Sequence, residues 1–259
     1  MINKVEIIKG TSTSEIMFFD SCDFSKLPNK RIVPLFGPNG SGKTTLINSM
    51  VGYLNAVRLR EQVKDKDPDL LKIADEDFSR SVKKAGCVLE LGNKKHMWLC
   101  YTNSTDNFAH RESRSIRESY DPMLLGMRFD ARSLSEGQSI VYSLYDFIDM
   151  LSTGKNGQRV IGGDILAFID EMDSGLSLDN LDMFLKKLKY YTNRREDLQV
   201  ILSFNNPRML KYFPYVISMY TGEVLELHSE EDMLAEFKKH EKAFNKARKL
   251  SNGRPRVYE

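Results

Sequence analysis

Apolar residues recur along the chain with two different periods, and the alternation between them predicts the order of elements. The uninterrupted apolar runs at 32–36 and 165–169 are typical of strands that are covered on both faces of a sheet. Elsewhere apolar positions recur every three or four residues, as on one face of a helix. Helices are expected at 46–57, 140–151, 178–188 and 230–250, and further strands at 199–204, 215–220 and 223–227.

Two pairs of short strands are expected to be antiparallel hairpins. Residues 5–8 and 15–19 flank the polar turn at 10–14, and residues 87–91 and 96–101 flank a Gly-Asn turn. The charge-dense stretch that begins at Leu59 is expected to form a solvated helix or an exposed loop.

Strands that alternate with helices predict an α/β fold, with a mostly parallel sheet flanked by helices and with N-terminal antiparallel strands. One domain over residues 1–259 is expected, with a small helical, arginine-rich lobe at about 102–137 and a C-terminal helix at about 230–250. The chain has 41% hydrophobic and 29% charged residues, an ordinary globular balance. Its net charge of +2 favours no particular class of partner.

The segment after the first apolar run has the sequence of a phosphate-binding loop. Residues Gly37-Pro38-Asn39-Gly40-Ser41-Gly42-Lys43-Thr44-Thr45 contain the pattern G-x-x-x-x-G-K-[ST] and precede a predicted helix. Glycines allow successive N–H groups to turn toward a phosphate, and the helix start is attractive to the same anion. Lys43 adds a cation for the β- and γ-phosphates, and the Thr44 hydroxyl is a suitable Mg²⁺ ligand. A P-loop nucleotide site is therefore predicted here.

Two carboxylates, Asp170 and Glu171, directly follow the second apolar run. In open α/β sheets, ligands bind outside the carboxyl ends of the strands, so both side chains are expected to face the nucleotide. Asp170 suits a Mg²⁺ ligand, and Glu171 suits a general base that activates water. A helix N-cap or an exposed turn is the structural alternative for this pair.

A third segment, Leu134-Ser135-Glu136-Gly137-Gln138, opens the helix expected at 140–151. A serine and a glycine at a helix start offer a hydroxyl and N–H groups to an anion. The segment resembles the L-S-G-G-Q signature motif of ATP-binding cassette (ABC) ATPases. It lies, in the family's order, between the phosphate loop and Asp170-Glu171, and Ser174-Gly175-Leu176 resembles the family's D-loop.

This resemblance implies an ABC ATPase head in which two ATP molecules, with Mg²⁺, are held between two protomers. Residues 37–45, Asp170 and Glu171 would act within one protomer. Ser135, Gly137 and Gln138 would contact the nucleotide of the other protomer and complete the cage around its γ-phosphate. A homodimer formed through ATP is therefore implied.

The segment Asn205-Asn206-Pro207 resembles the family's switch, with Asn205 where the histidine stands. An asparagine can hydrogen-bond a phosphate or a water but carries no charge, which predicts slow hydrolysis. No convincing Q-loop glutamine precedes the signature. With Ser177 at the end of the D-loop, these features most resemble the compact bacterial ATPases of the OLD and SMC-like branch. Relatives in that branch serve in DNA repair and phage defence beside an effector.

Three functions remain open. The first is a soluble ATPase that couples ATP binding or slow hydrolysis to a separate effector protein, of a DNA-processing or phage-defence kind. The second is the ATP-binding subunit of a membrane transporter, and the third is a non-hydrolysing nucleotide sensor or scaffold. Without a signal peptide, a membrane-spanning run or a cysteine pattern, a cytoplasmic location is expected. Arg111, Arg114 and Arg117 leave DNA binding open.

Overall fold

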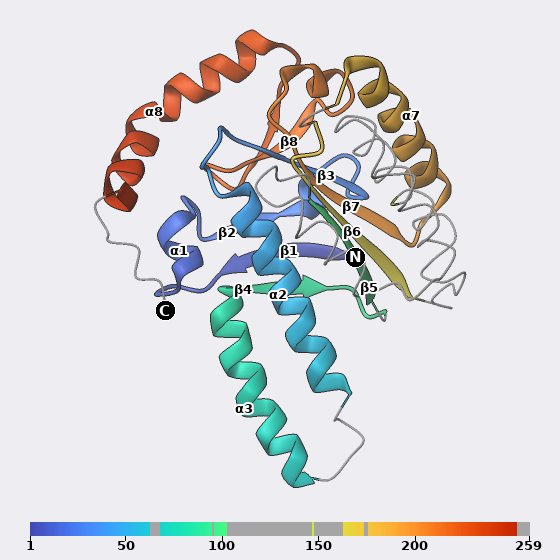
Figure 1. Cartoon of the computed structure of the whole chain (residues 1–259), viewed down its shortest axis with the longest axis vertical. Helices are drawn as coiled ribbons and strands as arrows, with labels where there is room; N and C mark the ends of the chain where they lie inside the picture. The colour runs from blue at the N-terminus through green and yellow to red at the C-terminus, as the bar shows by residue number, and fades with distance from the viewer. Residues whose placement is uncertain (63–67, 95, 103–146, 148–162, 174–175, 253–259) are drawn as a thin grey trace, which may run out of the picture. The chain divides into compact units, whose positions relative to one another are not determined.

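The computed structural model describes residues 1–62, 68–94, 96–102, 147, 163–173 and 176–252 (Figure 1). The chain divides into two compact units. Unit 1 consists of Met1, Arg31–Val33 and Gly92–Phe204, and unit 2 of Ile2–Lys30, Pro34–Leu91 and Asn205–Glu259.

Unit 1 is built on parallel strands. β5 (His96–Thr102) pairs with β6 (Asp164–Asp170), and β6 pairs with β7 (Leu198–Ser203). Every residue of β6 and β7 is buried, as expected for strands in the middle of an α/β sheet. The sheet continues from β7 to the start of β3 (Ile32–Phe36), where the Val200 N–H donates to the Arg31 carbonyl at 2.8 Å.

α7 (Leu178–Arg194) is the helix that links β6 to β7. It begins at Ser177, whose hydroxyl accepts the Asn180 N–H and so caps the first turn. The buried positions of α7 recur every three or four residues, as the sequence predicts: Leu181, Phe184, Leu185, Leu188 and Thr192.

Unit 2 contains the end of β3, which pairs in parallel with β8 (Tyr215–Ser218), and β8 pairs antiparallel with β9 (Val224–Glu226). The strand order is therefore β5-β6-β7-β3-β8-β9. The prediction of an α/β fold with a mostly parallel sheet is confirmed.

A separate antiparallel sheet in unit 2 has the order β2-β1-β4, formed by β1 (Ile2–Ile7), β2 (Ser21–Asp23) and β4 (Cys87–Leu91). N-terminal antiparallel strands are thus present, but the hairpin predicted at 5–8 and 15–19 is wrong. Residues Ser12–Ile16 form the helix α1 instead. The reason is local, because Thr11 and Ser14 form a capping box in which each side chain accepts the other's N–H.

The second predicted hairpin, at 87–91 and 96–101, is also wrong. β4 pairs with β1, whereas β5 pairs along its whole length with β6, from His96 opposite Asp164 to Thr102 opposite Asp170. Alternation of apolar residues indicates a strand but does not identify its partner. The two strands therefore belong to different sheets.

Two helices of unit 2 lie side by side: α2 (Lys43–Glu61), which follows the phosphate loop, and α3 (Pro68–Ala85) (Figure 1). The charge-dense stretch is thus largely helical, and Arg60 pairs with Asp75 of α3 at 2.7 Å. The C-terminal helix α8 (Glu230–Asn252) packs Phe237 on Phe36 of β3, with ring centroids 5.2 Å apart. Two 3-10 turns, η1 (Phe24–Lys26) and η3 (Pro207–Lys211), complete this unit's described elements.

Residues 103–137 of the predicted arginine-rich lobe lie outside the described residues. Of the helices that the structure does describe, not one combines the length and the apolar character that crossing a bilayer demands.

Alanine substitutions at Gly86 and Gly10 separate two contributions to the free energy of unfolding, steric clash and backbone strain. Both have left-handed backbones, with φ of 78° and 77°, but only at Gly86 would a Cβ meet another atom, Thr13 Oγ1 at 2.2 Å. Gly10→Ala is expected to destabilise the protein by about 1–2 kcal/mol through backbone strain alone. Gly86→Ala should cost about 1–3 kcal/mol more, because Thr13 must move. Urea unfolding measures both, and equal losses would contradict the close contact.

Candidate functional site

The predicted phosphate loop in unit 2 connects β3 to α2 and has a left-handed backbone at two of its glycines. Gly40 and Gly42 have φ of 82° and 92°, values that side chains disfavour. At Gly37 a Cβ would lie 2.4 Å from Ser41 Oγ and 2.9 Å from Met219 Cβ, so this position has no room for a side chain. The glycines are thus required both for the turn and for close packing.

The first turn of α2 has N–H groups that no side chain caps. Its N-cap is Gly42, which has no side chain. Ser41, just before it, is fully buried, and its hydroxyl has no hydrogen-bond partner within the described part of the chain. Uncapped helix N–H groups are partners for an anion, and the positive end of the helix dipole favours one.

Lys43 is buried, with only 6% of its surface exposed. Its ammonium donates hydrogen bonds to two carbonyls of the loop. The donor–acceptor distances are 2.5 Å to Gly37 O and 3.0 Å to Pro38 O. Both bonds place the cation over the loop where a phosphate is predicted to bind. Thr44 and Asn39 are exposed, and Thr45 is half-buried.

The two acidic residues lie at the end of β6 in unit 1. Asp170 is only 3% exposed, and its Oδ1 accepts a hydrogen bond of 2.5 Å from the hydroxyl of Ser203, the last residue of β7. Glu171 has a φ of 50°, the one positive value among the described residues that are not glycine. Its N–H donates to the same Ser203 oxygen at 2.8 Å. The pair is therefore not a helix N-cap, because the first residue of the next helix is Leu178.

The two adjacent asparagines after β7 have different environments. The Asn206 side chain accepts the Arg208 N–H at 3.0 Å and caps η3. Asn205 is half-buried and caps no described helix. The side-chain oxygen of Asn206 is thus used by a cap, and Asn205 stays the predicted switch residue.

A magnesium ion on a bound nucleotide would suit the donors that the chain offers. Mg²⁺ on triphosphates is held by one or two protein oxygens together with waters and phosphates. The Thr44 hydroxyl and the Asp170 carboxylate are oxygen donors of that kind. Among the described residues no three His, Cys, Asp or Glu side chains gather into a cluster that could hold a metal by themselves.

The predicted site residues are not all brought together within one unit. Residues 37–45 and Asn205 belong to unit 2, and Asp170 and Glu171 belong to unit 1. Ser135, Gly137 and Gln138 lie outside the described residues. Their joint action on one nucleotide stays a prediction.

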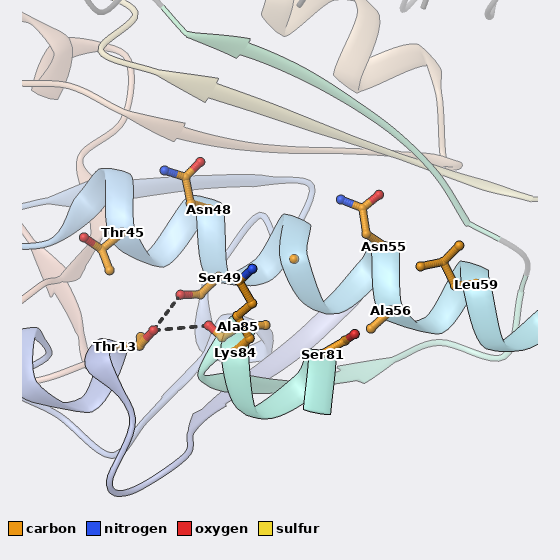
Figure 2. A pocket seen from close by; sticks show the side chains of 11 residues that line it. Thr13, Thr45, Asn48, Ser49, Asn55, Ala56, Leu59, Ser81, Lys84 and Ala85 are labelled. Atoms are coloured by element: carbon orange, nitrogen blue, oxygen red, sulfur yellow. Dashed lines mark hydrogen bonds between the residues drawn. The ribbon is translucent and has the colours of Figure 1, made fainter. Parts of the chain in front are cut away.

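A groove of about 460 Å³ lies between α2 and α3 and is distinct from the phosphate loop (Figure 2). Only Thr45 of the loop lines it. Asn48 and Asn55 project from one side of α2, and Ser81 and Lys84 of α3 also line it. At one end, Thr13 hydrogen-bonds Ser49 at 3.0 Å and the Ala85 carbonyl at 3.2 Å. The groove therefore has neither the glycines nor the carboxylates of the predicted site.

Sequence reasoning missed two contributions to the site. Ser203 falls only within the strand expected at 199–204, although a hydroxyl at the end of a buried strand is a signal for a polar contact. Ile16 and Met17 were assigned to a strand, but a Cβ on Gly42 would lie 2.4 Å from Met17 Cε and 3.0 Å from Ile16 Cγ2. The segment of α1 thus packs against the phosphate loop.

Comparison with known proteins gives distant relatives in sequence. No protein-family profile matches the chain. It is 24% identical over 214 residues to a "Probable iron chelatin transport ATP-binding protein" of Helicobacter pylori, covering 76% of this chain and 75% of that protein. It is 23% identical over 217 residues to the "Probable ATP-dependent transporter ycf16" of Trieres chinensis, covering 78% and 81%.

Among solved structures, the chain resembles that of C. elegans PCH-2 with a TM-score of 0.33 and 12% identity. The match covers 86% of this chain and 43% of that one, and it is too weak to carry an argument. One of the two sequence relatives is named as a transport ATP-binding protein and the other as an ATP-dependent transporter. They support placing the chain in the ABC ATPase superfamily, and they do not identify a branch within it.

Proposed function

We propose that this chain is an ABC-type ATPase that binds ATP with Mg²⁺, dimerises around two nucleotides and couples binding or slow hydrolysis to a separate partner protein. The observation that carries the proposal is the phosphate loop. Its left-handed Gly40 and Gly42, its uncapped helix start and its buried Lys43 together form an anion site. The names of the distant relatives, an ATP-binding protein and an ATP-dependent transporter, support ATP as the anion's source.

Each group in the site has a defined task. The N–H groups of residues 40–45 and the Lys43 ammonium hold the β- and γ-phosphates, which requires Lys43 to leave its two loop carbonyls. When bound, Mg²⁺ neutralises charge that develops on these phosphates. The Thr44 hydroxyl and Asp170 hold that ion, and the Glu171 carboxylate takes a proton from the attacking water.

The remaining groups act on the γ-phosphate. Asn205 contacts the phosphate or the attacking water as a neutral hydrogen-bonding group, so hydrolysis is slow. Ser135, Gly137 and Gln138 of the second protomer supply hydroxyl and N–H donors that complete the site only when two chains meet. ATP binding, rather than its hydrolysis, thus assembles the dimer.

The partner is the least constrained part of the proposal. An effector protein of a DNA-processing or phage-defence kind is our first candidate, because Asn205 replaces the switch histidine. A transporter subunit is the second candidate, and the names of the relatives favour it. A non-hydrolysing nucleotide sensor is the third. The genes next to this one discriminate: permease genes would support the transporter, and a nuclease or toxin gene the effector.

Lys43→Ala tests the phosphate loop. The variant removes one charge-assisted contact with the phosphates, so ATP–Mg²⁺ affinity should fall about 10- to 100-fold. Isothermal titration calorimetry measures the loss. Lys84→Ala is the matched control, since Lys84 lines the groove of Figure 2 and lies on the same unit. A larger loss of ATP–Mg²⁺ affinity in Lys84→Ala than in Lys43→Ala would indicate that the nucleotide binds in the groove and not at the loop.

Glu171→Gln tests the general base. The amide cannot accept the proton of the attacking water, so turnover should fall about 10²- to 10⁴-fold. ATP affinity should stay unchanged, and an ATP-dependent dimer should persist longer in size-exclusion chromatography with light scattering. Glu196→Gln, at an exposed glutamate of the same unit, is the control. Full activity in Glu171→Gln would show that another group is the base.

Mixed dimers test whether the signature acts across the interface. Lys43→Ala and Ser135→Glu each inactivate both sites of their own homodimer. A heterodimer of the two has one intact site, so a 1:1 mixture should regain about a quarter of the wild-type rate if chains exchange freely. A mixture of Lys43→Ala with Glu171→Gln is the control, because two defects that act in cis leave no intact site. No recovery in the first mixture, or equal recovery in both, would refute the shared site.

A further inference from the structure

The hydroxyl of Ser203 contacts both residues of the acidic pair. Ser203 ends β7 and is fully buried. Its oxygen lies 2.5 Å from Asp170 Oδ1 and 2.8 Å from the Glu171 backbone nitrogen. A backbone N–H can only donate, so the Ser203 oxygen accepts from Glu171 and its single proton goes to Asp170. Both directions of the network are therefore fixed.

The bond to Glu171 matters because this residue holds an unfavourable backbone conformation. A left-handed φ costs a residue with a side chain about 1–3 kcal/mol, and such conformations persist only where surrounding contacts hold them. The φ of Glu171 is 50°, and its N–H is tied to Ser203. The turn at Glu171 decides where its carboxylate points, so the Ser203 oxygen takes part in aiming that group.

The bond to Asp170 fixes the other acid. A buried carboxylate needs hydrogen-bond partners, and Ser203 engages one of its two oxygens. With Oδ1 held by the hydroxyl, the carboxylate cannot rotate freely about its last bond. Because Oδ1 accepts from Ser203, Oδ2 would be the oxygen offered to a metal ion or to the water bound to it.

We propose that Ser203 is a positioning residue that sets both acids at once, aiming Asp170 at Mg²⁺ and Glu171 at the attacking water. The inference rests on the proposed function and extends it by one residue. Ser203 contacts neither nucleotide nor metal and acts only through Asp170 and Glu171. Loss of its hydroxyl should therefore affect metal binding and turnover together while ATP affinity changes little.

A purely structural role for the hydroxyl is the competing explanation. Backbone contacts already hold this region, since Ile169 pairs with Leu202 and the Met172 N–H donates to the Ser203 carbonyl at 3.2 Å. Neither contact needs the Ser203 side chain, so Ser203→Ala is expected to fold. The two explanations differ in what the variant does to metal affinity.

The test compares Ser203→Ala with Ser203→Thr, which keeps a hydroxyl. Partners of metal ligands typically contribute 10- to 100-fold to metal affinity or activity, so Ser203→Ala should lose about that much in kcat and in Mn²⁺ affinity of the ADP-bound chain. Electron paramagnetic resonance measures Mn²⁺ binding without turnover. Hydrogen exchange at the peptide containing Glu171 should become faster. Ser203→Thr should recover most of the loss.

Thr192→Val is the control for loss of a buried hydroxyl in the same unit, because among the described residues the Thr192 hydroxyl donates to the Leu188 and Lys189 carbonyls of its own helix α7. It should leave kcat and Mn²⁺ affinity unchanged. Wild-type kcat and Mn²⁺ affinity in Ser203→Ala would overturn this inference alone. An equal loss of kcat and Mn²⁺ affinity in Thr192→Val would indicate that the Ser203 hydroxyl has only a structural role. A wild-type chain that neither binds nor hydrolyses ATP–Mg²⁺ would overturn the proposed function, and this inference with it.

Discussion

The parallel pairing of β6 with β7 is the interaction on which the acidic half of the site depends. Because Ile169 lies opposite Leu202, the residues that follow them, Asp170 and Ser203, end their strands side by side. Both strands are buried along their whole length, so their register cannot slip without moving apolar side chains. The hydroxyl therefore meets the carboxylate as a consequence of sheet formation. A carboxylate that is 3% exposed would be costly in that position without such a partner.

The phosphate loop satisfies its polar groups in a different way. Here the loop's own carbonyls at Gly37 and Pro38 accept hydrogen bonds from Lys43. The buried cation is thus compensated before an anion arrives, so a triphosphate must compete with two hydrogen bonds for the same ammonium. The exchange is favourable because a phosphate brings full negative charge where the carbonyls bring only dipoles. Ser41, buried without a partner among the described residues, adds a donor that the loop itself leaves unused.

The elements that could be predicted from the sequence are those with a long or regularly spaced pattern of apolar residues. Seven buried residues make β6 a central strand, and the regular spacing in α7 fixes its inner face. α1 was missed because five residues are too few for a period, and the capping of Thr11 by Ser14 decides their conformation. β5 was assigned the wrong partner because its alternation fits any neighbour. The phosphate loop and the acids could be predicted because their spacing is a motif. Ser203 acquires its contacts only when two strands, 33 residues apart in sequence at this contact, come together.

In the proposed function, the two asparagines after β7 have different roles. The Asn206 side-chain oxygen caps η3, whereas Asn205 stands where the resemblance places the switch residue. A neutral switch would hydrogen-bond the γ-phosphate without the charge that a protonated histidine contributes, so it would stabilise the bound state and the transition state about equally. Binding energy that is equal in both states does not accelerate hydrolysis. A site of this kind favours a long-lived ATP-bound dimer, and such a state suits a protein that holds a partner in one conformation better than one that must cycle rapidly.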